Sequence, residues 1–436
     1  MRGLNSKRLL AAGASLVLVL GVAACGDDDD DDGGGGGGET QLDLVIGDSI
    51  PLTGDLSPFG PPGQKAADMA KTEIDAAIQE TGVDHTVEVV HEDNETNPQA
   101  AVQAARKLVD SDGATCLAGA WASADSLPTA QSVSVPDGVL QISPASTSTE
   151  LTAVEDDGLL NRVPPADNLQ GPVLAQAIDQ ELQGAEGKTL NIGARNDAYG
   201  EAFTEALTSG WEELGGTVGE TVLYDPEQPS YNSEAQQITS GNPDAIALID
   251  FPETFEKVGP ALQRTQGWDP NKVFITDGLA SGDLIAAVDP LMEGFRGTAP
   301  GTPEAGASSQ AFDQLFQQSE PRNVQRNTFD AQNFDAVILC YLAAVAAGST
   351  DGQEMADALV DITAPGGDKF TWEQLPQAVE ALQNGDDIDY VGAAGEIDLD
   401  ENGDPTKGVY DVYRVQGGEI VPERQVDVED VEIIEE

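Results

Sequence analysis

Short apolar runs alternate with helical patterns along most of the chain. The first run, Leu44-Val45-Ile46, precedes apolar residues that recur at helical spacing between 66 and 78, which predicts a strand followed by a helix. A β-rich run at 87–90 then precedes Asn97 and Pro98, residues favoured at the N-cap and first turn of a helix. The same unit recurs, with further strands predicted at 115–118, 139–142, 190–194, 218–223, 245–249 and 273–276.

Alternation of this kind predicts an α/β fold, in which helices cover parallel sheets. One sheet holding all of these strands would be unusually large, and the strands fall into two series with a break at Val163-Pro164-Pro165. We therefore expect two lobes, each with a doubly wound sheet. Because ligands bind beyond the carboxyl ends of the strands in such sheets, two facing lobes would enclose a site in the cleft between them.

The last part of the chain has a different pattern. Short β-rich runs at 409–415 and 419–421 are separated by Gly417-Gly418, which predicts a hairpin. Just before it, residues 398–403 match the first half of an EF-hand loop, but Val409 stands at the twelfth position, where a bidentate glutamate is required. We interpret this segment as a turn and expect no bound metal ion.

The N-terminal residues have the features of an export signal. Arg2, Lys7 and Arg8 precede an uncharged stretch at 9–24, which is shorter than the ~20 residues of a membrane-spanning helix. The stretch ends in Val22-Ala23-Ala24-Cys25, which is similar to a bacterial lipobox. Residues 1–24 are therefore predicted to be a lipoprotein signal peptide and Cys25 the lipidated residue that anchors the chain to a membrane. The alternative is an ordinary signal peptide with a chance cysteine.

The residues directly after Cys25 have no apolar side chains with which to form a core. An aspartate run at 27–32 and a glycine run at 33–38 predict a disordered Asp/Gly tether over 25–40. Specific calcium binding by this run is the other reading, but a flexible acidic run lacks the fixed geometry of a calcium site.

The whole chain is strongly acidic. It has 20 Lys and Arg against 78 Asp and Glu, and a formal net charge of −58. Such a field argues against nucleic acid or an anionic lipid surface as a partner. Self-repulsion on this scale is tolerable mainly where salt screens it, so we expect a halophilic protein from a saline habitat.

The sequence has no pattern typical of an enzyme. The nucleophile motif G-x-S-x-G and the phosphate-binding loop are both absent, and the only histidines, His85 and His91, flank one β-rich run and are expected on the surface. Cys116 and Cys340 lie in apolar runs, which favours buried free thiols over a disulfide, although export permits one. We expect a binding protein with no catalytic residues, cofactor or metal.

Five runs in order strongly resemble the leucine/isoleucine/valine-binding protein family. They are Ile50-Pro51-Leu52-Thr53-Gly54, Asp93-Asn94-Glu95-Thr96-Asn97-Pro98, Ile142-Ser143-Pro144-Ala145-Ser146-Thr147, Tyr199-Gly200 and Phe334-Asp335-Ala336-Val337. The resemblance implies the type I periplasmic-binding fold, with two doubly wound parallel-sheet lobes joined by three hinge crossings. Lobe 1 would comprise 41–166 plus 300–391, and lobe 2 would comprise 167–299 plus 392–436.

The resemblance also implies a set of ligand-binding residues. The α-carboxylate of an amino acid would be held by Ser123, Ala145 and Thr147, which offer N–H and hydroxyl donors. Its ammonium would pair with Asp277, beside Tyr199 at the start of a helix. Simpler roles remain open: N-capping for Ser123 and Thr147, capping by an aromatic for Tyr199, and an ordinary turn for Asp277.

Two aromatic residues depart from the expected amino-acid site. Phe251 stands where a polar aromatic is common, and Trp121 lies in the loop before Ser123. Both could form an apolar wall around the ligand's side chain, or be ordinary aromatics of the cleft or core.

The function implied is that of a monomeric, lipid-anchored substrate-binding protein on the outer face of the cytoplasmic membrane or in the periplasm. It would deliver a branched-chain or other small amino acid to the permease subunits of an ABC importer. A receptor for an amide, urea or another small polar solute is the first alternative. A ligand sensor without a transport role is the second.

Overall fold

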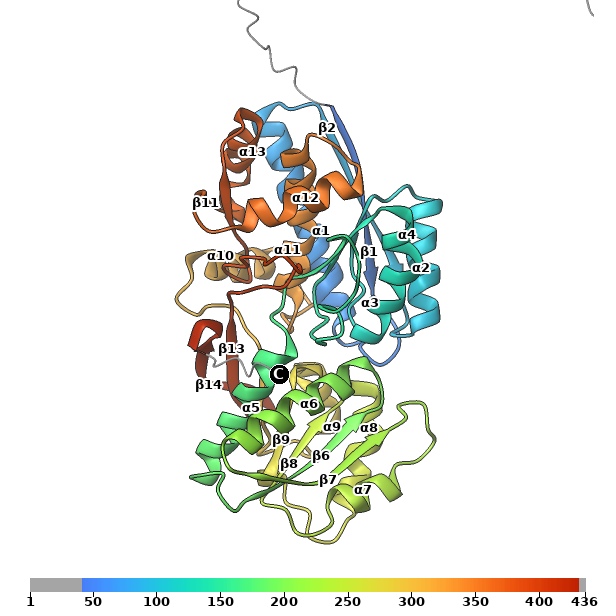
Figure 1. Cartoon of the computed structure of the whole chain (residues 1–436), viewed down its shortest axis with the longest axis vertical. Coiled ribbons are helices and arrows are strands. Elements are labelled where there is room, and N and C mark those ends of the chain that lie inside the picture. Colours follow the sequence, from blue (N-terminus) through green and yellow to red (C-terminus); the bar gives the residue numbers. More distant parts are fainter. Residues whose placement is uncertain (1–40, 431–436) are drawn as a thin grey trace, which may run out of the picture. The chain divides into compact units, whose positions relative to one another are not determined.

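The computed structural model describes residues 41–430. The predicted signal peptide, the lipidation site Cys25 and the tether therefore lie outside the described residues. The described chain forms two large sheets and one small one, and helices cover them (Figure 1). We call the five-stranded sheet and its helices lobe 1, and the seven-stranded sheet and its helices lobe 2.

All strands of the lobe 1 sheet are parallel, in the order β2-β1-β3-β4-β5. This is a doubly wound order in which the strand sequence reverses between β1 and β3. The carboxyl ends of these two strands therefore lie at a topological switch point, where such sheets bind their ligands. The strands are β1 (Leu42–Ile50), β2 (His85–Asp93), β3 (Cys116–Ala118), β4 (Leu140–Ser143) and β5 (Leu160–Arg162).

The central helix of lobe 1 is α11 (Asp330–Ala347). It is apolar around most of its circumference, as expected for a helix enclosed by other elements, and its residues from Asp330 to Val345 are buried. It packs against α1 and the first sheet. The other elements of this lobe are α1 (Gly60–Thr81), α2 (Pro98–Asp110), α3 (Ser123–Thr129), a π-helical segment (Ala130–Ser134), α4 (Val135–Asp137), α10 (Ala307–Gln318), α12 (Gly352–Thr363), β11 (Asp368–Thr371), α13 (Leu375–Asn384) and β12 (Ile388–Val391).

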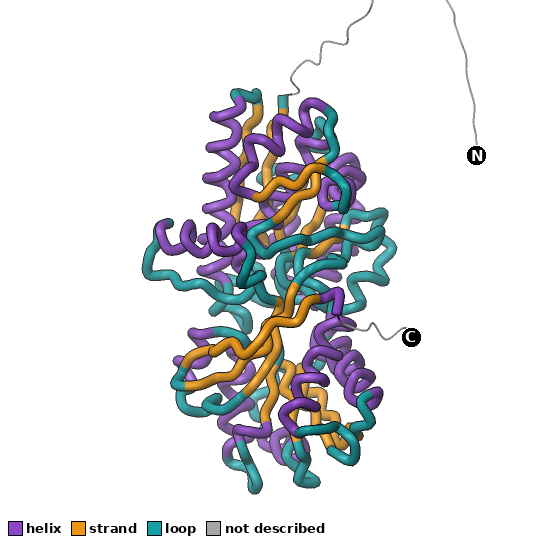
Figure 2. Tube along the Cα trace, turned by 90° about the vertical axis from the view of Figure 1, so that its left-hand side faces the viewer, coloured by secondary structure: helices purple, strands orange, loops and turns teal. Residues whose placement is uncertain are grey.

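The lobe 2 sheet has the order β14-β13-β10-β9-β8-β6-β7. Its strands are parallel except β13, which is antiparallel to both β10 and β14. Figure 2 shows purple helices on both sides of these orange strands. The elements are α5 (Asp167–Leu182), β6 (Thr189–Arg195), α6 (Ala198–Glu213), β7 (Thr217–Tyr224), α7 (Asn232–Ile238), β8 (Ala245–Ile249), α8 (Pro252–Gln263), β9 (Val273–Ile275), α9 (Gly282–Val288), β10 (Arg296–Pro300), β13 (Val409–Gln416) and β14 (Glu419–Asp427).

The predicted local signals agree with these elements. Each strand predicted between 44 and 276 overlaps an observed strand, and the Asn97 side chain caps α2 by accepting hydrogen bonds from the N–H groups of Gln99 and Ala100. The predicted hairpin is β13–β14, and both Gly417 and Gly418 have the positive φ that a tight hairpin turn requires. The segment interpreted as an imperfect EF-hand is a turn, in which the side chain of Asp400 accepts hydrogen bonds from the N–H groups of Asn402 and Asp404.

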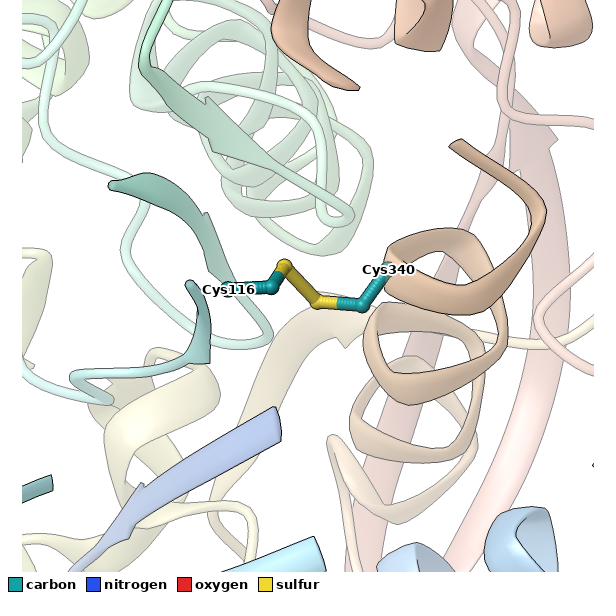
Figure 3. Close-up of a disulfide and its surroundings, with 2 residues drawn as sticks. All are labelled: Cys116 and Cys340. Carbon is teal, nitrogen blue, oxygen red and sulfur yellow. A yellow bond between two sulfur atoms is a disulfide. The ribbon is translucent and has the colours of Figure 1, made fainter. Parts of the chain in front are cut away.

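The prediction of free thiols at Cys116 and Cys340 is wrong, because the two cysteines form a disulfide (Figure 3). Cys116 lies on β3 and Cys340 lies on α11, which packs over that strand. Their Cα atoms are 5.9 Å apart, a separation that a disulfide bridges readily. The apolar runs correctly indicated burial, but burial alone does not reveal that two distant runs face each other.

The two histidines are not the surface residues that we expected. His85 is buried, with its Nδ1 atom 3.0 Å from the hydroxyl of Tyr341. His91 is partly buried, and its ring nitrogens lie 2.6 Å from Asp48 and 3.2 Å from Asp68. Although burial alone would lower it, the two carboxylates raise the pKa of His91 to about 10, so this histidine is a charged structural partner of the buried Asp48.

Within the described range, no single helix is long and apolar enough to span a membrane. Only α11 and α12 together reach that length and composition, across a bend of 103°.

Candidate ligand-binding site

Loops at the carboxyl ends of strands from both sheets enclose a small cavity. The volume open to the centre of a water-sized sphere is about 10 Å³, so the cavity holds roughly one water molecule. A larger ligand would therefore need the lobes or the side chains around the cavity to move. The lining residues are Leu56, Phe59, Trp121, Ala122, Ser123, Ala145, Tyr199, Phe251, Asp277, Gly278 and Phe329.

Most of the predicted site residues meet at this cavity. Trp121, Ser123 and Ala145 line it from lobe 1, and Tyr199, Phe251 and Asp277 line it from lobe 2. Thr147 is the exception, because it is buried near the cavity without lining it. The structure thus brings six predicted residues together, while their contacts with a ligand stay a prediction.

The lobe 1 side of the cavity carries hydroxyl and N–H groups. Ser123 is the first residue of α3, and its Oγ accepts a hydrogen bond from the N–H of Ser148 at 3.2 Å. The Oγ of Ser143 accepts bonds from the N–H groups of Ala145 and Ser146, which holds this loop against β4. The capping role is therefore wrong for Ser123, since the N-cap of α3 is Ala122 and Ser123 instead ties α3 to a different loop.

Thr147 has no capping role either. Its hydroxyl is buried and lies against the carboxyl group of Asp167, whose pKa it lowers, although the geometry falls short of a regular hydrogen bond. Its carbonyl accepts a hydrogen bond from the N–H of Asp167, at the start of α5. Thr147 therefore connects the lobe 1 loop to the first helix of lobe 2 through both its carbonyl and its hydroxyl.

The lobe 2 side of the cavity carries a buried carboxylate. Asp277 is only 2% exposed, so it is not an ordinary turn residue at the surface. The hydroxyl of Tyr199 donates to its Oδ1 at 2.9 Å, and the side-chain amide of Gln170 donates to the same oxygen at 3.0 Å. Burial raises the pKa of Asp277 to about 6, against the effect of these two hydrogen bonds. Among the described residues, no cationic side chain lowers that pKa.

A second carboxylate, Asp167, interacts with Asp277 and was missed by the sequence analysis. Asp167 is fully buried, and neither of its side-chain oxygens has a hydrogen bond of good geometry within the described chain. Burial, and then the negative charge of Asp277, raise the pKa of Asp167 well above its ordinary value. Two carboxylates in such a space favour at most one negative charge.

Aromatic rings form most of the remaining wall. Phe251 stacks on Tyr199 with ring centroids 5.3 Å apart and planes inclined by 15°. Trp121 meets Phe329 edge to face at 6.5 Å, and Phe59 lies 6.3 Å from the same ring. Such contacts stabilise the wall beyond its burial alone.

The sequence analysis missed Leu56, Phe59 and Phe329. The first two follow the family-like run at 50–54, and Phe329 lies shortly before the run at 334–337. Proximity to those two runs is the only signal in the sequence that could have indicated them. Loop aromatics have no periodicity from which a shared site can be read.

Comparison with known proteins places this chain among binding proteins. The sequence model of a family described as "Periplasmic binding protein" matches residues 44–419. The Leu/Ile/Val-binding protein homolog 1 of Brucella suis is 23% identical over 379 residues, which cover 86% of this chain and 91% of that protein.

A second relative has a different context. The chemotactic signal transduction system substrate-binding protein BasB of Halobacterium salinarum is 25% identical over 374 residues, 84% of this chain and 85% of that protein. Among solved structures, the leucine binding protein LivK of Thermotoga maritima superposes with a TM-score of 0.72 at 22% identity, covering 89% of this chain and all of that one. This likeness agrees with the predicted α/β fold of two parallel-sheet lobes.

Proposed function

The chain belongs to the family of periplasmic binding proteins, and from this premise we propose that it is the substrate-binding lipoprotein of an ABC importer for a branched-chain or other small amino acid. Proteins of this family bind small ligands outside the cytoplasm and work with ABC permeases, and they are not enzymes. The observation that carries the proposed ligand class is the buried, cation-free Asp277 facing hydroxyl and N–H donors across a small aromatic cavity.

A free amino acid matches this distribution of groups. Its ammonium would pair with Asp277, beside the hydroxyl of Tyr199, and a charge-assisted bond in a dry cavity is strong. Its carboxylate would take the hydroxyl of Ser123 and, in exchange for their present contacts with Ser143 and Asp167, the N–H of Ala145 and the hydroxyl of Thr147. The apolar side chain would then lie against the lining rings, among them Trp121 and Phe251.

We also propose that the ligand binds by closure of the two lobes about three hinge crossings. Lobe 1 would comprise 41–166 plus 300–391, and lobe 2 would comprise 167–299 plus 392–436. Two separate sheets, with the cavity lined from both, support this division. The lipid anchor on Cys25, the monomeric state and the halophilic habitat belong to the same proposal and rest on the sequence patterns described above.

Two alternatives remain, and each has its own discriminating feature. An amide, urea or another neutral polar solute would leave the charge of Asp277 without a partner. A sensor without a transport role is favoured by the similarity to BasB, which is named for chemotactic signal transduction. Permease and ATPase genes beside the gene for this chain would support transport.

A thermal-shift screen tests the proposed ligand class. Amino acids and amides are added singly at high salt, because a ligand that binds only the folded state raises the melting temperature. We expect the largest shifts with leucine, isoleucine or valine, and none with leucinamide, which has no carboxylate, or with isocaproate, which has no ammonium. A shift with urea or amides alone would contradict the proposal.

A further inference from the structure

Arg195, outside the cavity, joins the two lobes. It is the last residue of β6, and its side chain is 5% exposed. The guanidinium forms ion pairs with Asp197 and, at 3.9 Å, with Asp250, both in lobe 2. Its Nη1 also lies 3.2 Å from Oδ2 of Asp55, which belongs to the lobe 1 loop after β1. This last pair crosses from one lobe to the other.

Asp55 is held by more than one group of lobe 2. The hydroxyl of Thr254 donates to Oδ2 of Asp55 at 2.7 Å, and the N–H of Glu253 donates to its carbonyl at 3.4 Å. Both donors lie in the first turn of α8. Nearby, the hydroxyl of Ser57 donates to Glu253 at 3.1 Å in an exposed contact. The loop after β1 is therefore fastened to lobe 2 chiefly through Asp55.

The same guanidinium supports the wall of the cavity. It lies 3.7 Å from the ring centroid of Phe251, a cation–π contact. Phe251 stacks on Tyr199, and Tyr199 donates to Asp277. A continuous series of contacts thus leads from Asp55 of lobe 1, through Arg195 and the two rings, to the buried carboxylate of the site.

The local charge makes Arg195 hard to replace. Asp125, on α3 of lobe 1, is 1% exposed and interacts electrostatically with Arg195. A single guanidinium therefore offsets the negative charge of four carboxylates, those of Asp55, Asp125, Asp197 and Asp250. Burial alone would lower the pKa of Arg195, but the carboxylates outweigh it and raise that pKa, so the guanidinium stays charged. Without it, carboxylates of the two lobes would repel each other at close range.

We propose that Arg195 is a latch and positioning residue, which holds Asp55 of the opposite lobe and keeps the rings of Phe251 and Tyr199 in place when the lobes close. This inference rests on the proposed binding function, because it assigns Arg195 a part in closing the same cleft. The latch connects lobe closure to the shape of the site, so that the binding wall is complete only when the lobes are together.

Small-angle scattering without ligand tests the latch independently of what the protein binds. Asp55→Asn removes the charge that crosses the lobes, and we expect its ligand-free radius of gyration to exceed that of the wild type. Glu253→Gln, which alters only the exposed contact to Ser57, is the matched control and should leave the radius unchanged. Equal radii for Asp55→Asn and the wild type would overturn the latch.

Stopped-flow measurements with leucine then test its effect on binding. A contact that holds the lobes closed and breaks when they open acts mainly on dissociation, so Asp55→Asn should release leucine at least about tenfold faster with little change in association, and Asp55→Glu should restore slow release. A reduced active fraction with an unchanged dissociation rate would indicate a purely structural role and overturn the proposal. If the wild type binds no leucine while ligand-free Asp55→Asn expands, the latch stands and the amino-acid function fails.

The positioning role requires that the latch and the ring act together. In a double-mutant cycle of Asp55→Asn and Phe251→Leu, the combined loss of leucine affinity should be smaller than the product of the two single losses by at least about threefold, because the variants interrupt one series of contacts. A combined loss equal to that product would overturn the positioning role. For the control pair, Glu253→Gln and Phe251→Leu, the combined loss of leucine affinity should equal the product of the two single losses.

Discussion

At the scale of single residues, the environment of Asp277 makes a sharp prediction about specificity. If the ligand is a free amino acid, Asp277→Asn leaves a buried ammonium without its counter-charge, which costs about 3–5 kcal/mol, or more than a hundredfold in affinity. Asparagine has nearly the same shape, so the ligand-free melting temperature should change little. Calorimetry with leucine on both proteins measures the effect.

The matched control for that experiment is Asp283→Asn. It makes the same change of charge at an exposed position on α9, where the loss should stay below about 1 kcal/mol. Retained leucine affinity in Asp277→Asn would mean that the ligand places no ammonium at this carboxylate.

The raised pKa of Asp277 also predicts a pH dependence of binding. The ligand's ammonium favours the ionised carboxylate, so affinity should be full above the pKa of about 6 and should fall as the pH drops through it. At pH 5 the affinity for leucine should be about tenfold lower than at pH 7. Tyr199 and Asp167 face the same carboxylate, but Tyr199 stays neutral and Asp167 has a pKa raised well above its ordinary value.

The Asp277→Asn variant assigns that pH dependence. Its residual leucine affinity, measured by calorimetry from pH 5 to pH 7, should lose the tenfold change. A variant that keeps the wild-type profile would instead point to Asp167 as the titrating group.

Single residues could be predicted from the sequence where a strand end fixed their position. Ala145 and Asp277 closely follow β4 and β9, so a parallel-sheet architecture and a family-like motif were enough to place them. Phe329 could not be placed in this way, because it reaches the cavity from a loop preceding α11, far along the chain. Asp167 was missed because a polar residue at the start of a helix ordinarily has a capping role.

At the scale of elements, the disulfide predicts how β3 and α11 are held together. Cys116 and Cys340 are 224 residues apart, so the bond restricts a large part of the unfolded chain. Replacing both with alanine should lower the free energy of unfolding by about 2–5 kcal/mol. Denaturant titrations of the two proteins measure the difference.

Reduction separates the cross-link from the packing of the sulfur atoms. Wild-type protein that is unfolded, reduced and refolded under reducing conditions keeps both side chains, and it should lose most of the same stability. If the reduced wild type is as stable as the oxidised protein, the loss in the alanine variant comes from packing alone.

The elements themselves were predictable in proportion to their apolar content. β8, with all five residues buried, coincides with its predicted run at 245–249. β5 and β11 were not predicted, because they are short and carry polar residues, so their pairing depends on neighbouring strands rather than on a local pattern. β10 was missed because Gly297 and Pro300 are unfavourable in an isolated strand.

At the scale of the whole molecule, the division into two lobes could be predicted from the sequence, whereas the contact between the lobes could not. The break predicted at Val163-Pro164-Pro165 separates the last strand of the first sheet from α5, the first helix of lobe 2. The sequence pattern could therefore indicate two lobes. It could not indicate that Asp55 and Arg195, 140 positions apart, form a pair between them, since that contact depends on how the lobes meet.

The net charge leads to a prediction about the stability of the whole molecule. With 20 Lys and Arg against 78 Asp and Glu, the carboxylates far outnumber the cations, so the repulsion between them depends on screening by dissolved ions. The Debye length rises from ~3 Å at 1 M salt to ~30 Å at 0.01 M, where charges repel across the whole protein. Unfolding separates the charges and relieves this repulsion, so the melting temperature should fall as salt is removed.

Thermal unfolding in NaCl and in KCl, each from 1 M to 0.01 M, measures this dependence. Screening depends on ionic strength and not on which monovalent cation is present, so the two series should coincide, with most of the change at low concentration. Exclusion of salt from the protein surface would instead stabilise progressively at high concentration. A melting temperature that stays constant throughout would contradict both the role of screening and the inferred saline habitat.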